Sequence, residues 1–120
     1  MQDKDKINFR PAEPSDLAIL LDLMAALYLH DESPFDRERA ERATRELLRS
    51  PEHGGIWILE IEAAIAGYIV LAFSFSLEFG GREGIVDELF LQENYRHQGW
   101  GKQALQFAAE QCKVRGICAM

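Results

Sequence analysis

Seven consecutive residues near the carboxyl end of the chain have the types and spacing of an anion-binding loop. Residues 96–102 read Arg-His-Gln-Gly-Trp-Gly-Lys, and an alanine-rich helical pattern follows them. Gly99 and Gly101 allow a sharp turn and a close approach of the backbone to a ligand. The free N–H groups and the dipole at the start of a helix attract anions, and Arg96 and Lys102 add two cations. The segment therefore predicts a pyrophosphate-binding loop.

The spacing distinguishes this loop from two better-known phosphate loops. A Walker loop needs Ser or Thr after its lysine, but Gln103 follows Lys102, so no hydroxyl is available for magnesium. A dinucleotide fingerprint has a third glycine where this chain has Ala104, a substitution that some Rossmann proteins tolerate. The topology argues against a Rossmann fold, because the fingerprint normally opens a series of βαβ units. Here it follows a hairpin-rich stretch near the end of the chain.

The pattern Arg-x-x-Gly-x-Gly between a strand and a helix resembles motif A of the GNAT superfamily of acyl-coenzyme A-dependent N-acetyltransferases. The resemblance extends over nearly the whole chain, although only motif A is specific. Phe9–Ala12, followed by Asp16 and a leucine-rich helix, is similar to the opening of the family. Residues 56–75 resemble its second and third strands, and residues 87–96 resemble its fourth strand and the exit from that strand.

The resemblance implies acetyl-coenzyme A as a cosubstrate whose pyrophosphate binds the backbone N–H groups of the loop. It also implies that the pantetheine amides pair with the preceding strand, where a backbone N–H faces the thioester carbonyl. The implied cofactor-binding residues are Leu89, Phe90, Leu91, Arg96, His97, Gln98, Gly99, Trp100, Gly101 and Lys102. For the side chain of Trp100 two roles are open: it covers part of the nucleotide, or it packs against the end of the sheet.

Transfer of an acetyl group to an amine needs a base, because an ammonium ion has no lone pair. Glu88 is the best match to the carboxylate that many GNAT members place on the fourth strand, and Asp87 is the alternative. Strand alternation sends these neighbours to opposite faces, so only one of them faces the cleft unless a bulge shifts the register. Both are also compatible with solvated carboxylates at a strand end.

A second polar group lies between the first two predicted helices, in a loop that often shapes the acceptor pocket of GNAT members. His30, Asp31 and Glu32 are therefore candidate contacts for the amine, or parts of an ordinary solvated connector. The three histidines of the chain lie in separate segments, and its two cysteines, Cys112 and Cys118, lack a Cys-x-x-Cys spacing. The sequence predicts reduced thiols and no metal.

Length and composition predict one domain over residues 1–120, with 48% hydrophobic and 28% charged residues. A net charge of −7 argues against a nucleic-acid partner and mildly favours a cationic acceptor. Residues 1–6 are polar and charged and do not resemble a signal peptide. The longest apolar stretch, residues 63–73, is far shorter than the roughly 20 residues that cross a bilayer. We expect a cytoplasmic protein without a membrane span.

Hydrophobic periodicity predicts three helices. The first begins at Ser15 as N-cap and buries a stripe of Leu17, Leu20, Leu21, Met24, Leu27 and Tyr28. The second begins at Asp36 and buries Ala40, Ala43, Leu47 and Leu48. The last covers residues 99–115, with Ala104, Leu105, Ala108 and Cys112 as its inner face, and it ends at Gly116.

Runs of β-branched and aromatic residues predict strands over residues 6–10, 56–61, 65–75 and 85–91. Residues 62–63 form the reversal of one hairpin, and Gly80-Gly81 with the two residues after them form the next turn. Residues 117–120 start another strand. With the resemblance, the expected fold class is α/β (α+β): a GNAT-like mixed, mainly antiparallel sheet with helices on both faces and incomplete C-terminal strands.

The early end of the chain at Met120 differs from the family, which normally continues with a full fifth strand, another helix and a closing pair of strands. The chain is a fragment, a short member, or one that borrows the missing half from a second subunit. An open fourth-strand edge favours a homodimer. The expected function is transfer of an acetyl group from acetyl-coenzyme A to a primary amine of a small molecule or peptide. The alternative is a non-catalytic acyl-coenzyme A sensor or interaction module.

Overall fold

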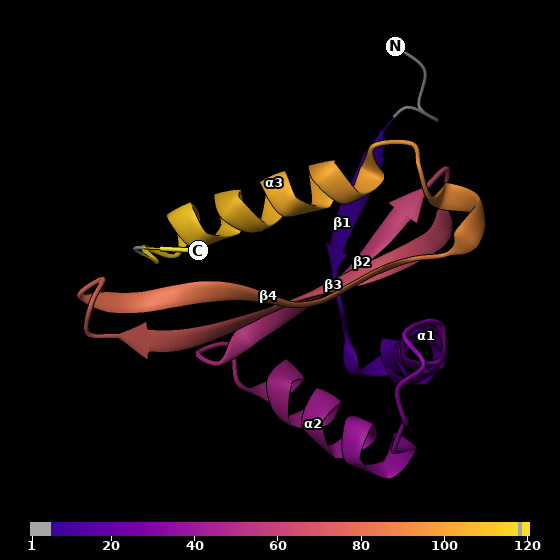
Figure 1. The fold of residues 1–120 in the computed structure, drawn as a ribbon, viewed down its shortest axis with the longest axis horizontal. Helices are drawn as coiled ribbons and strands as arrows, with labels where there is room; N and C mark the ends of the chain where they lie inside the picture. The colour runs from indigo at the N-terminus through magenta and orange to yellow at the C-terminus, as the bar shows by residue number, and fades with distance from the viewer. Residues whose placement is uncertain (1–5, 118) are drawn as a thin grey trace.

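The computed structural model describes residues 6–117 and 119–120, and within them the chain forms one antiparallel sheet between two helical layers (Figure 1). The strand order is β1-β2-β3-β4. The strands are β1 (Ile7–Pro11), β2 (Gly54–Ile61), β3 (Ala64–Ser76) and β4 (Gly81–Leu91). Helices α1 (Leu17–His30) and α2 (Arg37–Arg49) cover one face, and α3 (Trp100–Val114) covers the other. The expected fold class, with helices on both faces, is confirmed.

The two faces of the sheet contribute to two separate hydrophobic clusters. Ile56 and Ile58 of β2 pack in the cluster under α1, whereas Trp57 and Leu59 pack in the cluster under α3. Strand β3 alternates in the same way. Since both faces of the central strands are covered, β2 and β3 read as nearly continuous apolar runs in the sequence.

The two hairpins differ in how well the sequence locates their turns. Glu62 and Ala63 both have positive φ values, 54° and 65°, in a two-residue loop that suits the twist of the strands, as predicted. The second turn is displaced from its predicted position, because β4 begins at Gly81 and pairs there with Ser76. Pairing with β3 extends β4 over Arg82 to Gly84, although these residues have a low intrinsic β-propensity.

Three predictions about the helices are wrong in detail. The first helical segment begins one turn before α1 as a 3₁₀ turn, η2 (Pro14–Asp16), with Glu13 rather than Ser15 as N-cap. Leu105 was predicted on the inner face of α3 but is 44% exposed. The buried residues of α3 repeat every four positions through Ala104 and Ala108, so Leu105 lies to the side of this stripe. In α2, Ala43 is exposed, and Thr44 takes the buried position.

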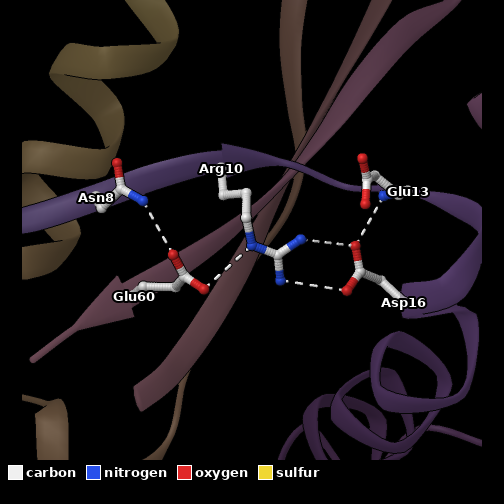
Figure 2. Close-up of polar contacts among 5 residues, drawn as sticks. All are labelled: Asn8, Arg10, Glu13, Asp16 and Glu60. Carbon is white, nitrogen blue, oxygen red and sulfur yellow. Dashed lines mark hydrogen bonds and ion pairs between the residues drawn. The ribbon is translucent and has the colours of Figure 1, made fainter. Parts of the chain in front are cut away.

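A polar cluster ties β1 to β2 and to the start of α1 (Figure 2). Arg10 donates two hydrogen bonds to Asp16, at 2.9 and 3.2 Å, and one from its Nε to Glu60 at 3.1 Å. The Asp16 carboxylate also accepts from the backbone N–H of Glu13 at 2.7 Å, and Asn8 donates to Glu60 at 2.9 Å. These bonds fix the point at which the chain leaves the sheet and enters α1.

The end of the chain returns to the outer side of β4. The backbone N–H of Gly84 donates to the carbonyl of Ala119 at 2.8 Å, and Glu83 and Ala119 form a parallel bridge. This bridge agrees with the predicted start of another strand over residues 117–120, of which Cys118 lies outside the described residues. Further along β4, residues 85–91 pair only with β3 among the described residues.

No helix within the described ranges is long and apolar enough to cross a membrane.

Candidate active site

The loop between β4 and α3 has the backbone geometry that its glycines predict. Strand β4 ends at Leu91, a 3₁₀ turn, η3 (Glu93–Tyr95), follows, and His97 and Gly99 adopt left-handed conformations with φ values of 62° and 87°. The first hydrogen bond of α3 is donated by the Gln103 N–H to the Gly99 carbonyl at 3.2 Å. The N–H groups of residues 100–102 therefore have no partner within the helix.

The space beside this helix terminus is open. A Cβ atom at Gly101 would meet nothing closer than Leu91 Cδ1 at 4.0 Å, and one at Gly99 would meet nothing within 4 Å. Packing within the described protein thus does not require glycine at position 101. A pyrophosphate group seated on the N–H groups would fill this space, so the loop fits the nucleotide part of coenzyme A.

The side chains of the loop mostly serve the protein itself. Arg96 donates from Nε to the Leu91 carbonyl at 2.8 Å, and its guanidinium lies 5.3 Å from the ring centre of Phe90. Gln98 donates to the Asn94 carbonyl at 2.9 Å. The Trp100 side chain is buried in a cluster with core residues of β2 and β3, so it packs against the end of the sheet rather than over a nucleotide. His97 and Lys102 are exposed.

A cavity of about 320 Å³ lies on the other side of the sheet, between α1, α2 and the central strands. Its lining residues are Met24, Tyr28, Pro34, Phe35, Asp36, Arg39, Ala40, Ala43, Thr44, Leu47, Ile56, Val70, Asp87 and Glu88. The cavity is therefore apolar for most of its lining and carries two adjacent carboxylates from β4.

A β-bulge brings these two carboxylates together. Val70 pairs with Glu88 and Leu71 pairs with Val86, so Asp87 is the extra residue of β4. Regular alternation would send one of the two carboxylates to the opposite face. Because the bulge interrupts the alternation, both Asp87 and Glu88 line the cavity.

Two tyrosines hold the Glu88 carboxylate. Tyr28 of α1 donates to Oε2 at 2.8 Å, and Tyr68 of β3 donates to Oε1 at 2.7 Å. The hydrogen bond to Glu88, with burial, raises the pKa of Tyr28 to about 12. Burial and the same carboxylate raise the pKa of Tyr68 as well. Both hydroxyls therefore remain protonated and donate to the Glu88 carboxylate.

The sequence did not reveal either tyrosine as part of the site. Tyr28 was predicted only as a member of a core stripe, and Tyr68 lies within an apolar run. They are 60 and 20 residues from Glu88, so no local spacing connects them. The sequence gives one signal for such a site: a tyrosine among apolar residues, because the hydroxyl of a buried tyrosine needs a hydrogen-bond partner.

The structure does not bring His30, Asp31 and Glu32 to the cavity. All three are exposed at the end of α1 and in the turn after it, and none lines the cavity. The neighbouring residues Phe35 and Asp36 do line it. Among the described residues, no group of three or more His, Cys, Asp or Glu side chains could hold a metal ion.

Strand β4 thus leads into an open helix terminus at its end and presents two carboxylates to a cavity beside its middle. A sequence model of the acetyltransferase (GNAT) family matches residues 20–120. The chain therefore belongs to the GNAT acetyltransferase family, and the resemblance of its motif A is confirmed.

Solved structures agree with this assignment. An integron cassette protein from the mobile metagenome of Cole Harbour Salt Marsh is 34% identical, with a TM-score of 0.88 over 98% of this chain and 76% of its own. A predicted acetyltransferase with acetyl-CoA from Clostridium acetobutylicum is 18% identical (TM-score 0.80; 96% and 80% covered). Glucosamine-6-phosphate N-acetyltransferase from Arabidopsis thaliana is 20% identical (TM-score 0.72; 95% and 79% covered). No curated protein sequence matches the chain.

Proposed function

We propose that the protein transfers an acetyl group from acetyl-coenzyme A to the amine of a small molecule. The observation that carries the proposal is the position of two complementary sites on one strand. Strand β4 presents Asp87 and Glu88 to a cavity and then continues into a loop with an open helix terminus. This arrangement supports a reaction that uses a base from the cavity and an anion site in the loop.

In this proposal the coenzyme binds along the end of β4 and the loop. The pyrophosphate accepts hydrogen bonds from the N–H groups at residues 99–102, and Lys102 adds positive charge. Leu89, Phe90 and Leu91 supply backbone groups to the pantetheine arm. This role is supported by the outer edge of β4, where residues 85–91 have no further strand among the described residues.

The thioester supplies an activated acyl carbon, and the chain supplies a proton acceptor and a place for the amine. Glu88 takes the proton of the bound ammonium ion, so that the nitrogen lone pair forms the new C–N bond as the C–S bond breaks. Tyr28 and Tyr68 orient this carboxylate through their hydrogen bonds. Asp87 is the alternative base and a second anchor for the ammonium ion, since it lines the same cavity.

The homodimer expected from the sequence is part of the proposal. Beyond the bridge at Ala119, no described residue pairs with the outer edge of β4, and Ile85 and Met120 beside it are 45% and 55% exposed. An open edge with apolar side chains favours pairing with another chain. Sedimentation over a range of concentrations tests this point, and a monomer at every concentration would contradict it.

Calorimetric titration with coenzyme A tests the proposed cofactor site. Gly101→Val places a side chain in the open space at the helix terminus, so we expect binding to be lost while thermal unfolding stays cooperative. Gln106→Val, at an exposed position of the same helix, controls for the lower helix propensity of valine. Unchanged affinity in Gly101→Val would refute the site. Coenzyme release across a panel of amines then tests the reaction, and binding without any turnover would favour the sensor alternative.

A further inference from the structure

We propose that the acceptor is a small primary amine with one apolar substituent, such as an arylalkylamine. It carries no carboxylate or phosphate. This inference rests on the proposed function, because it identifies the substrate class of the same cavity. It follows from three properties of the cavity: the row of side chains next to Glu88, the balance of charge in its lining, and the shortage of free hydrogen-bonding groups.

The register of the sheet places an apolar path directly beside the catalytic carboxylate. Ile56 of β2 pairs with Val70 of β3, and Val70 pairs with Glu88 of β4. All three side chains line the cavity, so they form one row across the sheet. Two strand spacings separate the ends of this row, which is about 10 Å. An ammonium group at Glu88 would therefore extend its carbon arm over Val70 and Ile56.

The opposite wall of the cavity is also mostly apolar. It is formed by Met24 of α1, Phe35 before α2, and Ala40 and Leu47 of α2. At about 320 Å³, the cavity is at the lower end of the range of small-molecule sites. A ring or a short alkyl chain on the amine would be enclosed between this wall and the row on the sheet.

The charged residues of the cavity favour one cation and disfavour an anion. Among the described residues, Arg39 is the only cationic one in the lining, and its Nε lies 3.9 Å from an Asp36 carboxylate oxygen. Asp36 also caps α2 by accepting from the Arg39 N–H at 3.1 Å. Asp87 and Glu88 then have no compensating cation in the lining. A ligand ammonium ion would supply that charge, whereas a ligand carboxylate or phosphate would add a like charge.

The hydroxyl groups of the lining are already used within the protein. The Tyr28 hydroxyl donates to Glu88, and the buried Thr44 hydroxyl lies 3.7 Å from the Met24 sulfur, to which it donates. The hydroxyls of a polyhydroxylated ligand such as an amino sugar would lose hydration wherever they face the apolar part of this lining. The lining therefore selects against sugars for a reason separate from charge.

The test compares four acceptors by coenzyme release at saturating acetyl-coenzyme A. They are 2-phenylethylamine, phenylalanine, glucosamine 6-phosphate and a short peptide with an N-terminal alanine. Phenylalanine is the matched probe, since it adds only a carboxylate to the first amine. We expect kcat/KM for 2-phenylethylamine to exceed that for each of the other three by about 100-fold or more. An equal or higher value for any of these three would overturn the inference.

A size-selective variant checks that the arm occupies this cavity. Ala43 lines the cavity at an exposed position of α2, so Ala43→Leu fills part of the space with little risk to folding. We expect its kcat/KM for 2-phenylethylamine to fall about tenfold relative to that for ethylamine. Ala26→Leu adds the same volume at an exposed position of α1 outside the cavity and should leave the ratio unchanged. An unchanged ratio in Ala43→Leu would contradict the inference.

Direct binding separates failure of this inference from failure of the proposed function. The ¹⁹F signal of 4-fluorophenethylamine is followed as wild type or Asp87→Asn is added, without coenzyme. If no amine is turned over, the proposed transfer reaction fails, but saturable binding that weakens in Asp87→Asn still supports the cavity as an apolar-amine site. No binding at millimolar amine, or equal binding by both proteins, overturns the inference even if other amines are acetylated.

Discussion

Strand β4 connects two regions that are built in opposite ways. The loop after its end uses backbone: three N–H groups at a helix terminus, two left-handed residues and open space at Gly101. The cavity beside its middle uses side chains, since Tyr28, Tyr68 and Glu88 come from three different elements and meet through hydrogen bonds of 2.7 and 2.8 Å. A backbone site depends on local sequence, whereas the side-chain site depends on the whole fold.

The two regions also differ in the charge they accept. The helix terminus and Lys102 favour an anion, and Asp87 and Glu88 favour a cation. The proposed reaction needs both, because one of its substrates carries phosphates and the other is an ammonium ion. Substitutions on the two sides of β4 should therefore affect different kinetic constants, and this separation is open to experiment.

We expect the largest loss of activity from a substitution in the cavity. Glu88→Gln removes the proposed base, so kcat should fall by about 10²- to 10⁴-fold while the calorimetric Kd for coenzyme A stays the same. Glu83→Gln is the matched control, since Glu83 lies on the same strand outside the cavity and its side chain accepts a hydrogen bond from the Ser74 hydroxyl at 3.3 Å.

A larger loss of kcat in Asp87→Asn than in Glu88→Gln would assign the base to Asp87 instead. Because the bulge brings both carboxylates to the cavity, this outcome would change the residue and leave the region unchanged. A loss of coenzyme affinity in Glu88→Gln would be more serious, as it would contradict the separation of the two regions.

We expect the next largest effect, a loss of coenzyme affinity, from a substitution in the loop after β4. Gly99 has a φ of 87°, where a Cβ atom costs roughly 1–2 kcal/mol, so Gly99→Ala should distort the helix terminus. We expect the Kd for coenzyme A to rise about tenfold, which corresponds to about 1.4 kcal/mol. At saturating coenzyme, kcat should change by less than about threefold, since the cavity is unaltered.

Gly80→Ala is the matched control for the strain itself. Gly80 has a φ of 76° in the β3–β4 turn, and a Cβ there would also meet nothing within 4 Å. The two variants should lose similar stability in thermal unfolding, but only Gly99→Ala should lose coenzyme affinity. Equal affinities in both variants would show that the loop does not bind the coenzyme.

The same contrast explains how much of the molecule could be predicted from its sequence. The left-handed Gly99 and the start of α3 were predictable, because glycine spacing and helix periodicity act within a few residues. The error at Leu105 came from the same local reasoning, since α3 buries a narrow stripe one residue away. Strand ends in the β3–β4 hairpin depend on cross-strand pairing, and the start of β4 was predicted at Ile85, four residues after its actual start at Gly81.

The carboxylate site was only partly predictable. Glu88 and Asp87 were candidates from the resemblance, but strand alternation could not decide between them. The bulge that brings both to the cavity is a property of the β3–β4 pairing and leaves no mark in the local pattern. The partners Tyr28 and Tyr68 come from helix α1 and strand β3, so they appear only when the sheet and helix are packed.

A smaller effect should follow from removing one of these partners. Tyr28→Phe deletes one donor to Glu88, so kcat should fall about fivefold, equivalent to about 1 kcal/mol. Tyr95→Phe, outside the cavity, is the matched control.

The pKa of Tyr28 also sets the pH range of this contact. Its folded value of about 12 exceeds the ordinary 10.0, so its contribution to stability is complete below about pH 10 and is lost as the pH rises through 12. The difference in unfolding free energy between wild type and Tyr28→Phe should therefore be constant near neutrality and shrink in strong base. A difference that grows with pH would contradict the hydrogen bond to Glu88.

The smallest effect on activity should come from substitutions in the polar cluster around Arg10. This cluster is distant in sequence from both the loop after β4 and the cavity, but it fixes the start of α1. Asp16→Asn should lower the free energy of unfolding by about 1.5–3 kcal/mol in urea, because the carboxylate accepts from Arg10 and from the Glu13 backbone. We expect kcat to stay within about twofold, since α1 still carries Tyr28 to Glu88 in the folded protein.

The stability contributed by Asp16 should depend on pH. Hydrogen bonds from Arg10 lower the pKa of Asp16 below 3.8, so its stabilisation is present above about pH 4 and is lost as the pH falls through the lowered value. The stability gap between wild type and Asp16→Asn should therefore close at low pH. Asp22→Asn is the control, because its pair with Arg37 has side chains 65% and 50% exposed and should contribute less than about 1 kcal/mol. If the two variants lose equal stability at neutral pH, the cluster in Figure 2 does not hold α1 in place, and the geometry of the Tyr28–Glu88 contact must depend on the apolar packing of α1 alone.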